Sequence, residues 1–186
     1  GIIVSLLNIS RPARGVSVPF TTIEECTLLE HNSILDATRR WVSETVIGLN
    51  LCPFARRELV KERVRFVATD AGSEEALLMA LQDELVHLNE HPEVETTLLV
   101  HPGVLRDFAE YNEFLAAADG LLEYLELDGI YQIASFHPDY QFGGTRPDDA
   151  ENYTNRSPYA MLHLLREESL DRVIAGYPGT ELIPGQ

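Results

Sequence analysis

The chain carries little positive charge, few cysteines and no long apolar run. Its 14 lysine and arginine residues stand against 30 aspartate and glutamate residues, and the formal net charge is -16. Phosphate backbones and anionic membranes repel such a charge, so neither nucleic acid nor a membrane is an expected partner. Two cysteines, Cys26 and Cys52, are too few for a disulfide scaffold and favour a reducing, cytoplasmic setting. No apolar run approaches the roughly 20 residues that span a bilayer.

The length and the hydrophobic content predict one domain. A chain of 186 residues with 45% hydrophobic residues is long enough for one buried core. The first 23 residues contain no aspartate or glutamate but include Arg11 and Arg14. We therefore expect residues 1–30 to be a disordered or weakly docked extension, with a composition that a processed leader could share. Residues 31–176 form the predicted domain, and residues 177–186 form an irregular tail.

Helical and extended patterns alternate through this domain. Ser33 and Ser73 are expected helix N-caps, and Pro53 suits the first position of a short helix. Strands are predicted over residues 64–69, 96–101 and 130–137, with helices over 73–91 and 105–127 between them. Ser157-Pro158 is predicted to open a last amphipathic helix with apolar residues at 161, 162, 164 and 165. The resulting βαβαβ order predicts an α/β fold, in which helices pack on a small sheet of three or more strands.

Two of the predicted strands end in the same way, as His101-Pro102 and His137-Pro138. If these strands are parallel, both imidazoles lie at the carboxyl edge of the sheet, where open α/β sheets place ligand crevices. Either histidine could then act as a general base or as a metal ligand. The alternative is that each His-Pro pair merely ends a strand, with its ring bonded to a backbone carbonyl.

A long polar segment, residues 137–160, follows the third strand. Loops of this length in compact domains are usually functional or disordered, and the aromatic residues in this one argue for order. Arg156 precedes the expected helix start, where a guanidinium and unpaired N–H groups could hold a carboxylate or a phosphate. A salt bridge from Arg156 to a nearby acidic residue is the alternative. The other candidate site residues of the loop are Asp139, Tyr140, Asn152 and Asn155.

Cys52 would stand at the N-terminus of the short helix, where unpaired N–H groups and the helix dipole favour a thiolate. It is therefore a candidate nucleophile, with a small buried hydrophobic residue as the alternative. Cys52, His101 and His137 could together bind zinc and leave one position open for water. A hard cation held by the loop carboxylates is a further possibility, although the spacing matches no EF-hand. Nucleotide fingerprints of the Walker and Rossmann types are missing, as is a serine nucleophile elbow.

Three motifs carry a resemblance to a known family. They are GLNLCPFA at residues 48–55, FHPDYQF at residues 136–142 and PDDAENYTNRSPY at residues 147–159. With them the chain resembles a bacterial family catalogued as domain of unknown function fourteen-fifteen. The resemblance extends from about residue 33 to residue 174, which implies that the first 30 residues lie outside the domain. It implies no particular activity or cofactor.

The sequence thus predicts a cytoplasmic α/β protein with a crevice that binds a small, anionic molecule. Hydrolase or transferase chemistry would suit the groups available. In this hypothesis Cys52 is the nucleophile or a ligand, His137 the base or a ligand, and Asp139 the residue that orients His137. Substrate would be held by Arg156, Asn152, Asn155 and Tyr140. The alternatives are a zinc site at Cys52, His101 and His137, and a domain without enzymatic activity that binds a ligand or a partner.

Overall fold

The computed structural model describes residues 23–48 and 53–175. A long helix, α1 (Ile23–Trp41), continues into a single π-helical segment, η1 (Val42–Ile47), and is followed by the short helix α2 (Pro53–Val60). Strands and helices then alternate as β1 (Val64–Ala68), α3 (Glu74–Glu90), β2 (Thr96–Val100), α4 (Phe108–Tyr124) and β3 (Tyr131–Phe136). A 3-10 turn, η2 (Ala150–Thr154), precedes strand β4 (Met161–Arg166) and helix α5 (Glu167–Ala175).

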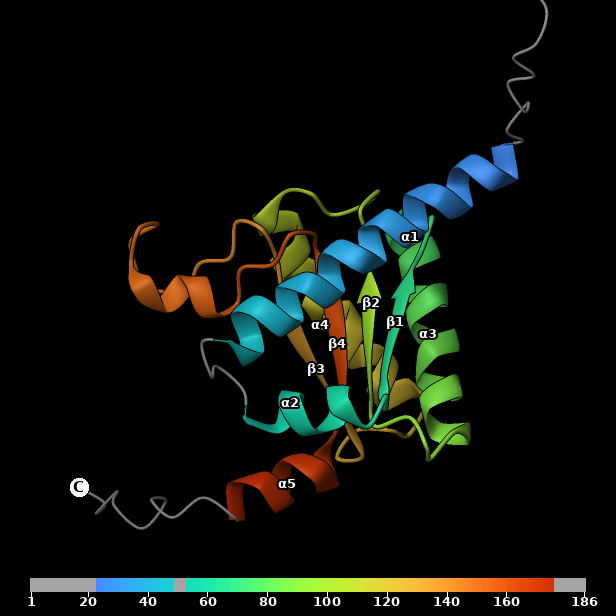
Figure 1. Cartoon of the computed structure of the whole chain (residues 1–186), viewed down its shortest axis with the longest axis vertical. Coiled ribbons are helices and arrows are strands. Elements are labelled where there is room, and N and C mark those ends of the chain that lie inside the picture. Colours follow the sequence, from blue (N-terminus) through green and yellow to red (C-terminus); the bar gives the residue numbers. More distant parts are fainter. Residues whose placement is uncertain (1–22, 49–52, 176–186) are drawn as a thin grey trace, which may run out of the picture.

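The four strands form one mixed sheet in the order β1-β2-β4-β3. β1 and β2 are parallel, whereas β4 is antiparallel to both β2 and β3. Because β2 and β3 both oppose β4, they run in the same direction as each other. The carboxyl ends of β1, β2 and β3 therefore meet at one edge of the sheet, as Figure 1 shows.

Helices cover both faces of the sheet (Figure 1). On one face, α3 and α4 bury a leucine-rich cluster against β2 and β4, including Leu81, Leu99 and Leu162, which are fully buried. On the other face, α1 and η1 pack over a smaller cluster that includes Val42, Leu98 and Met161. The fold class is thus confirmed as a single mixed α/β domain.

Two helix starts follow the local chemistry of their caps. Ser73 has extended backbone geometry and its hydroxyl accepts a hydrogen bond from the N–H of Ala76, as expected for an N-cap. Asp107 caps α4 by accepting from the N–H groups of Ala109 and Glu110. The latter helix begins three residues after the predicted position, because Leu105 has a φ of 56° and stands in the loop.

The prediction of a helix after Ser157-Pro158 was wrong, because Met161–Arg166 is strand β4. The strand lies between β2 and β3 and is covered on both faces, so it needs a nearly continuous apolar run rather than an alternating one. Such a run, Met-Leu-His-Leu-Leu, also fits a helical stripe, which explains the error.

Helix α1 begins at Ile23, ten residues before the predicted cap at Ser33. The predicted boundary at residue 31 therefore falls within this helix. The rest of the predicted extension, residues 1–22, and the predicted tail, residues 177–186, lie outside the described residues. In the part that the structure describes, no helix has both the length and the apolar character needed to cross a membrane.

Candidate functional site

The carboxyl edge of the sheet brings His101 and His137 into one buried cluster. His101 directly follows β2, His137 directly follows β3, and the two side chains are 0% and 1% exposed. Tyr111 of α4 contacts both rings, with centroid separations of 5.8 Å to His101 and 5.1 Å to His137. His101 and His137 are 36 residues apart in the sequence, and both thus contact the same aromatic side chain.

The hydroxyl of Tyr111 ties this cluster to the sheet. It donates to the carbonyl oxygen of Met161 at 2.8 Å and accepts from the backbone N–H of Phe136 at 3.0 Å. Burial raises the pKa of Tyr111 far above its ordinary value, so the phenol stays protonated. α4 is thereby fixed to the facing ends of β3 and β4.

His137 is held in one neutral tautomer by its two neighbours. Its Nε2–H donates to the carbonyl of Leu105 at 3.2 Å, and its Nδ1 accepts from the backbone N–H of Asp139 at 3.0 Å. The contact from Asp139 therefore comes from its main chain, while its carboxylate is exposed. Both ring nitrogens of His137 are engaged within the protein.

His101 has one unsatisfied nitrogen. Its Nδ1–H donates to the carbonyl of Val104 at 3.1 Å, which makes Nε2 an acceptor, and Nε2 has no hydrogen-bond partner among the described residues. Burial, opposed by the hydrogen bond to Val104 and assisted by the nearby His137, lowers the pKa of His101 from its ordinary 6.5 to about 4. His101 is therefore neutral at physiological pH and presents a buried lone pair.

Asn152 organises the long loop from inside. It is fully buried, and its side-chain oxygen accepts from the N–H of Phe142 and the hydroxyl of Thr145, both at 2.9 Å. Its amide donates to the carbonyl of Arg146 at 2.7 Å. These contacts join positions up to ten residues apart, so the loop is ordered by an internal polar anchor.

The other predicted ligand-holding residues also make internal contacts. The Asn155 amide donates to the carbonyl of Ser135 at 3.0 Å, and its main-chain carbonyl accepts from the N–H of His137. The ring of Tyr140 packs between neighbours, at 5.2 Å from the ring of Phe108 and 4.9 Å from that of Phe142. The side chains of Asn152, Asn155 and Tyr140 thus hold the loop together and attach it to its neighbours.

Arg156 is the charged residue of the predicted substrate-holding set, and its side chain also makes internal contacts. Its Nε–H donates to the carbonyl of Tyr140 at 3.1 Å and its Nη2 to that of Pro147 at 2.7 Å. The guanidinium lies 4.5 Å from the ring centre of Tyr153. Across residues 23–48 and 53–175 no carboxylate forms an ion pair with it, so the salt bridge considered above is not formed.

Arg156 does not stand at a helix N-terminus, because the expected helix is strand β4. The reasoning that paired its charge with unpaired N–H groups of a helix is therefore wrong. What the structure offers instead is a guanidinium fixed by two carbonyl oxygens and an aromatic ring.

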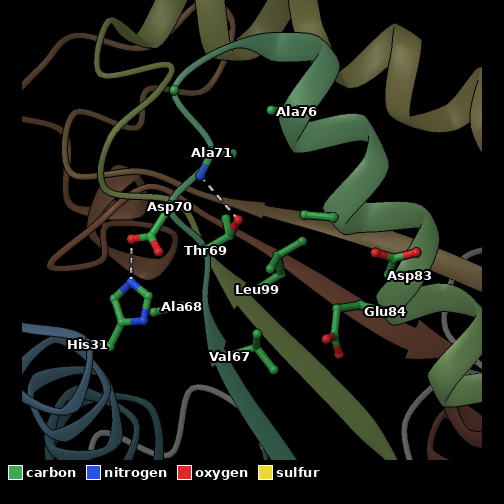
Figure 2. Close-up of a pocket in the computed structure, with 12 residues that line it drawn as sticks. His31, Val67, Ala68, Thr69, Asp70, Ala71, Ala76, Asp83, Glu84 and Leu99 are labelled. Atoms are coloured by element: carbon green, nitrogen blue, oxygen red, sulfur yellow. Dashed lines mark hydrogen bonds and ion pairs between the residues drawn. The ribbon is translucent and has the colours of Figure 1, made fainter. Parts of the chain in front are cut away.

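A cavity of about 530 Å³ lies at the outer edge of the sheet, between β1 and α3 (Figure 2). At its rim His31 Nε2 of α1 bonds to Asp70 Oδ1 of the loop after β1, at 2.7 Å. This pair was not among the predicted site residues. The partners are 39 residues apart, and no local motif signals their contact.

Only part of the predicted zinc site lies within the described residues. Cys52 lies outside the described residues, and no group of three metal-ligating side chains occurs within the part that is described. Of the two histidines, only His101 has a ring nitrogen without a hydrogen-bond partner.

These features define the class of the protein: a mixed α/β domain with a buried histidine and tyrosine cluster at the carboxyl edge and an anchored polar loop beside it. The chain belongs to the family described as protein of unknown function (DUF1415), whose model matches residues 33–186. The resemblance seen in the three motifs is thereby confirmed. Searches of the curated proteins and of the solved structures found no match.

Proposed function

We propose that this domain binds a small anionic molecule, a carboxylate or a phosphate ester, through Arg156 in the loop of residues 137–160. One observation carries the proposal: the Arg156 guanidinium is fixed in place but has no carboxylate partner among the described residues. In a chain with 30 acidic residues, pairing with an internal carboxylate would be the ordinary outcome. The positive charge of Arg156 is therefore available to an anion from outside the protein.

The geometry of Arg156 suits an anion. A guanidinium has five N–H donors, and the contacts to Tyr140 and Pro147 engage only Nε and Nη2. Nη1 is left to donate to an oxyanion, and Arg is the residue best matched to planar or bidentate oxyanion recognition. Because the loop already holds the guanidinium, little side-chain entropy is lost when the anion binds.

The proposed chemistry is hydrolase- or transferase-like, with Cys52 as the nucleophile. His137 as found here has no free lone pair, since Nδ1 accepts from Asp139 and Nε2 carries the proton. It can act as a base only if the Asp139 hydrogen bond opens. The contacts of His137 therefore support a positioning role, which joins the loop before α4 to the loop after β3.

Replacement of Arg156 is expected to weaken anion binding selectively. We expect isothermal titration with inorganic phosphate and with small carboxylates to show saturable binding to the wild type. Charge-assisted hydrogen bonds contribute about 2 kcal/mol, so Arg156→Gln should raise Kd roughly thirtyfold, and Arg156→Lys should raise it less.

Arg146→Gln is the matched control, because Arg146 is an exposed arginine of the same loop whose side chain forms no hydrogen bond, ion pair or ring contact with residues 23–48 or 53–175. It should leave Kd unchanged. Equal weakening by Arg146→Gln and Arg156→Gln would reduce the effect to general loss of positive charge and contradict the proposed site.

A zinc site is the second candidate, favoured by the buried, neutral His101 with an unpartnered Nε2. Neutral imidazole is the form that binds zinc. His137 could join Cys52 and His101 as a ligand only if its hydrogen bond from Asp139 opens. If these residues bind the ion, elemental analysis should find near-stoichiometric zinc in the wild type, none in Cys52→Ser, and an unchanged content in the control Cys26→Ser. Absence of zinc from all three proteins rejects this candidate and leaves the Arg156 proposal intact.

A further inference from the structure

The cavity beside β1 exists because α3 turns small side chains toward the edge strand. Ala76 and Ala80, one turn apart on α3, line it together with Val67 and Leu99 of the sheet. Leucine at either alanine position would occupy this space. Cavities of roughly 300 to 1,000 Å³ are the usual size for small-molecule sites, and this one, at about 530 Å³, falls within that range.

The walls of the cavity are apolar in the middle and acidic at both ends. Figure 2 shows Asp70 on one side and Asp83 on the other, with Val67 and Leu99 between them. Val67 and Leu99 belong to neighbouring parallel strands and are directly paired in register, so they form one continuous apolar floor.

The two carboxylates at the ends of the cavity, Asp70 and Asp83, can still accept hydrogen bonds. Asp70 Oδ1 bonds to His31, whereas its Oδ2 forms no hydrogen bond or ion pair with the described residues. Asp83 has no hydrogen bond or ion pair among the described residues. Glu84, by contrast, is neutralised by Arg65, which donates to both of its carboxylate oxygens at 2.7 and 3.1 Å. The lining of the cavity therefore has a net negative charge. The carboxylate of Asp83 is free among the described residues, and that of Asp70 has one oxygen engaged.

We infer that this cavity binds a linear aliphatic diamine, with one ammonium group at Asp70, the other at Asp83, and the alkyl chain along Val67 and Leu99. The net charge of -16 supports the same choice, because it raises the local concentration of cations. The inference is independent of the anion site at Arg156, which lies on another loop.

Isothermal titration with α,ω-diaminoalkanes of increasing length tests this inference. The wild type should bind diamines with an optimum length, and should bind the monoamine of the same chain length about tenfold more weakly. Added salt should weaken binding, because the carboxylates are exposed to solvent and salt screens their attraction for the ammonium groups. Absence of diamine binding by the wild type, or equal binding of monoamine and diamine, would overturn the inference.

Two variants and one control locate the site. Asp83→Asn, at an exposed position without contacts, should keep the fold and raise Kd about tenfold. Ala80→Leu should fill the cavity and abolish binding while the thermal unfolding transition is retained. Glu90→Gln removes an exposed carboxylate of α3 outside the cavity and should change nothing. Unchanged binding in both Asp83→Asn and folded Ala80→Leu would contradict the proposed location.

Discussion

Tyr111→Phe is expected to lower the free energy of unfolding by about 3 kcal/mol. The substitution removes a single oxygen, but that oxygen serves two main-chain groups. It donates to the carbonyl of Met161 and accepts from the N–H of Phe136. Each buried backbone group left without a partner costs about 1 to 3 kcal/mol. Urea denaturation at neutral pH measures the difference.

Tyr124→Phe is the control, because Tyr124 is 81% exposed and its side chain forms no hydrogen bond or ring contact within the described part of the chain. It should change the free energy of unfolding by less than about 0.5 kcal/mol. An equally small effect of Tyr111→Phe would mean that the hydroxyl does not join α4 to the sheet, and the account of the carboxyl edge would fail with it.

Acid is expected to destabilise the fold between about pH 6.5 and about pH 4, because folding buries His101 in its neutral form. The pKa of His101 is 6.5 in the unfolded chain and about 4 in the folded one. Within this window the unfolded state binds the proton and the folded state does not, so stability is fully present above the unfolded pKa and is lost as the pH falls. The loss from His101 alone is about 3 kcal/mol.

His163 should act in the same window, since burial also lowers its pKa to about 4. Urea denaturation of the wild type across this pH range should show the loss, and His101→Gln should have a flatter pH dependence even if it is less stable at neutral pH. A wild-type profile that stays level from neutral pH down to about pH 4 contradicts the buried neutral histidines.

Local chemistry was enough to predict much of the fold. Ser73 was identified as an N-cap from its own position and the acidic residues after it, and its bond to Ala76 confirms this. The strands that end at His101 and His137 were likewise predicted from short apolar runs between turn signals. These features depend on neighbours along the chain, which a sequence displays directly.

Several of the errors and omissions involve distant partners. β4 is a strand because β2 and β3 flank it, and nothing in residues 161–166 alone distinguishes this from a helical stripe. Likewise, the buried contacts by which Asn152 orders the loop reach Phe142 and Thr145, and no neighbouring residue signals them. The contact between His31 and Asp70 depends on how α1 crosses the sheet.

The most direct test of the central claim is an NMR titration that follows the Nε–H resonance of each arginine side chain while phosphate or a small carboxylate is added. The Arg156 guanidinium is the proposed anion-binding group, so its resonance should shift saturably while that of Arg146 stays in place. A protein in which Arg156 does not respond, or in which all arginines shift together without saturation, would contradict an anion site in this loop.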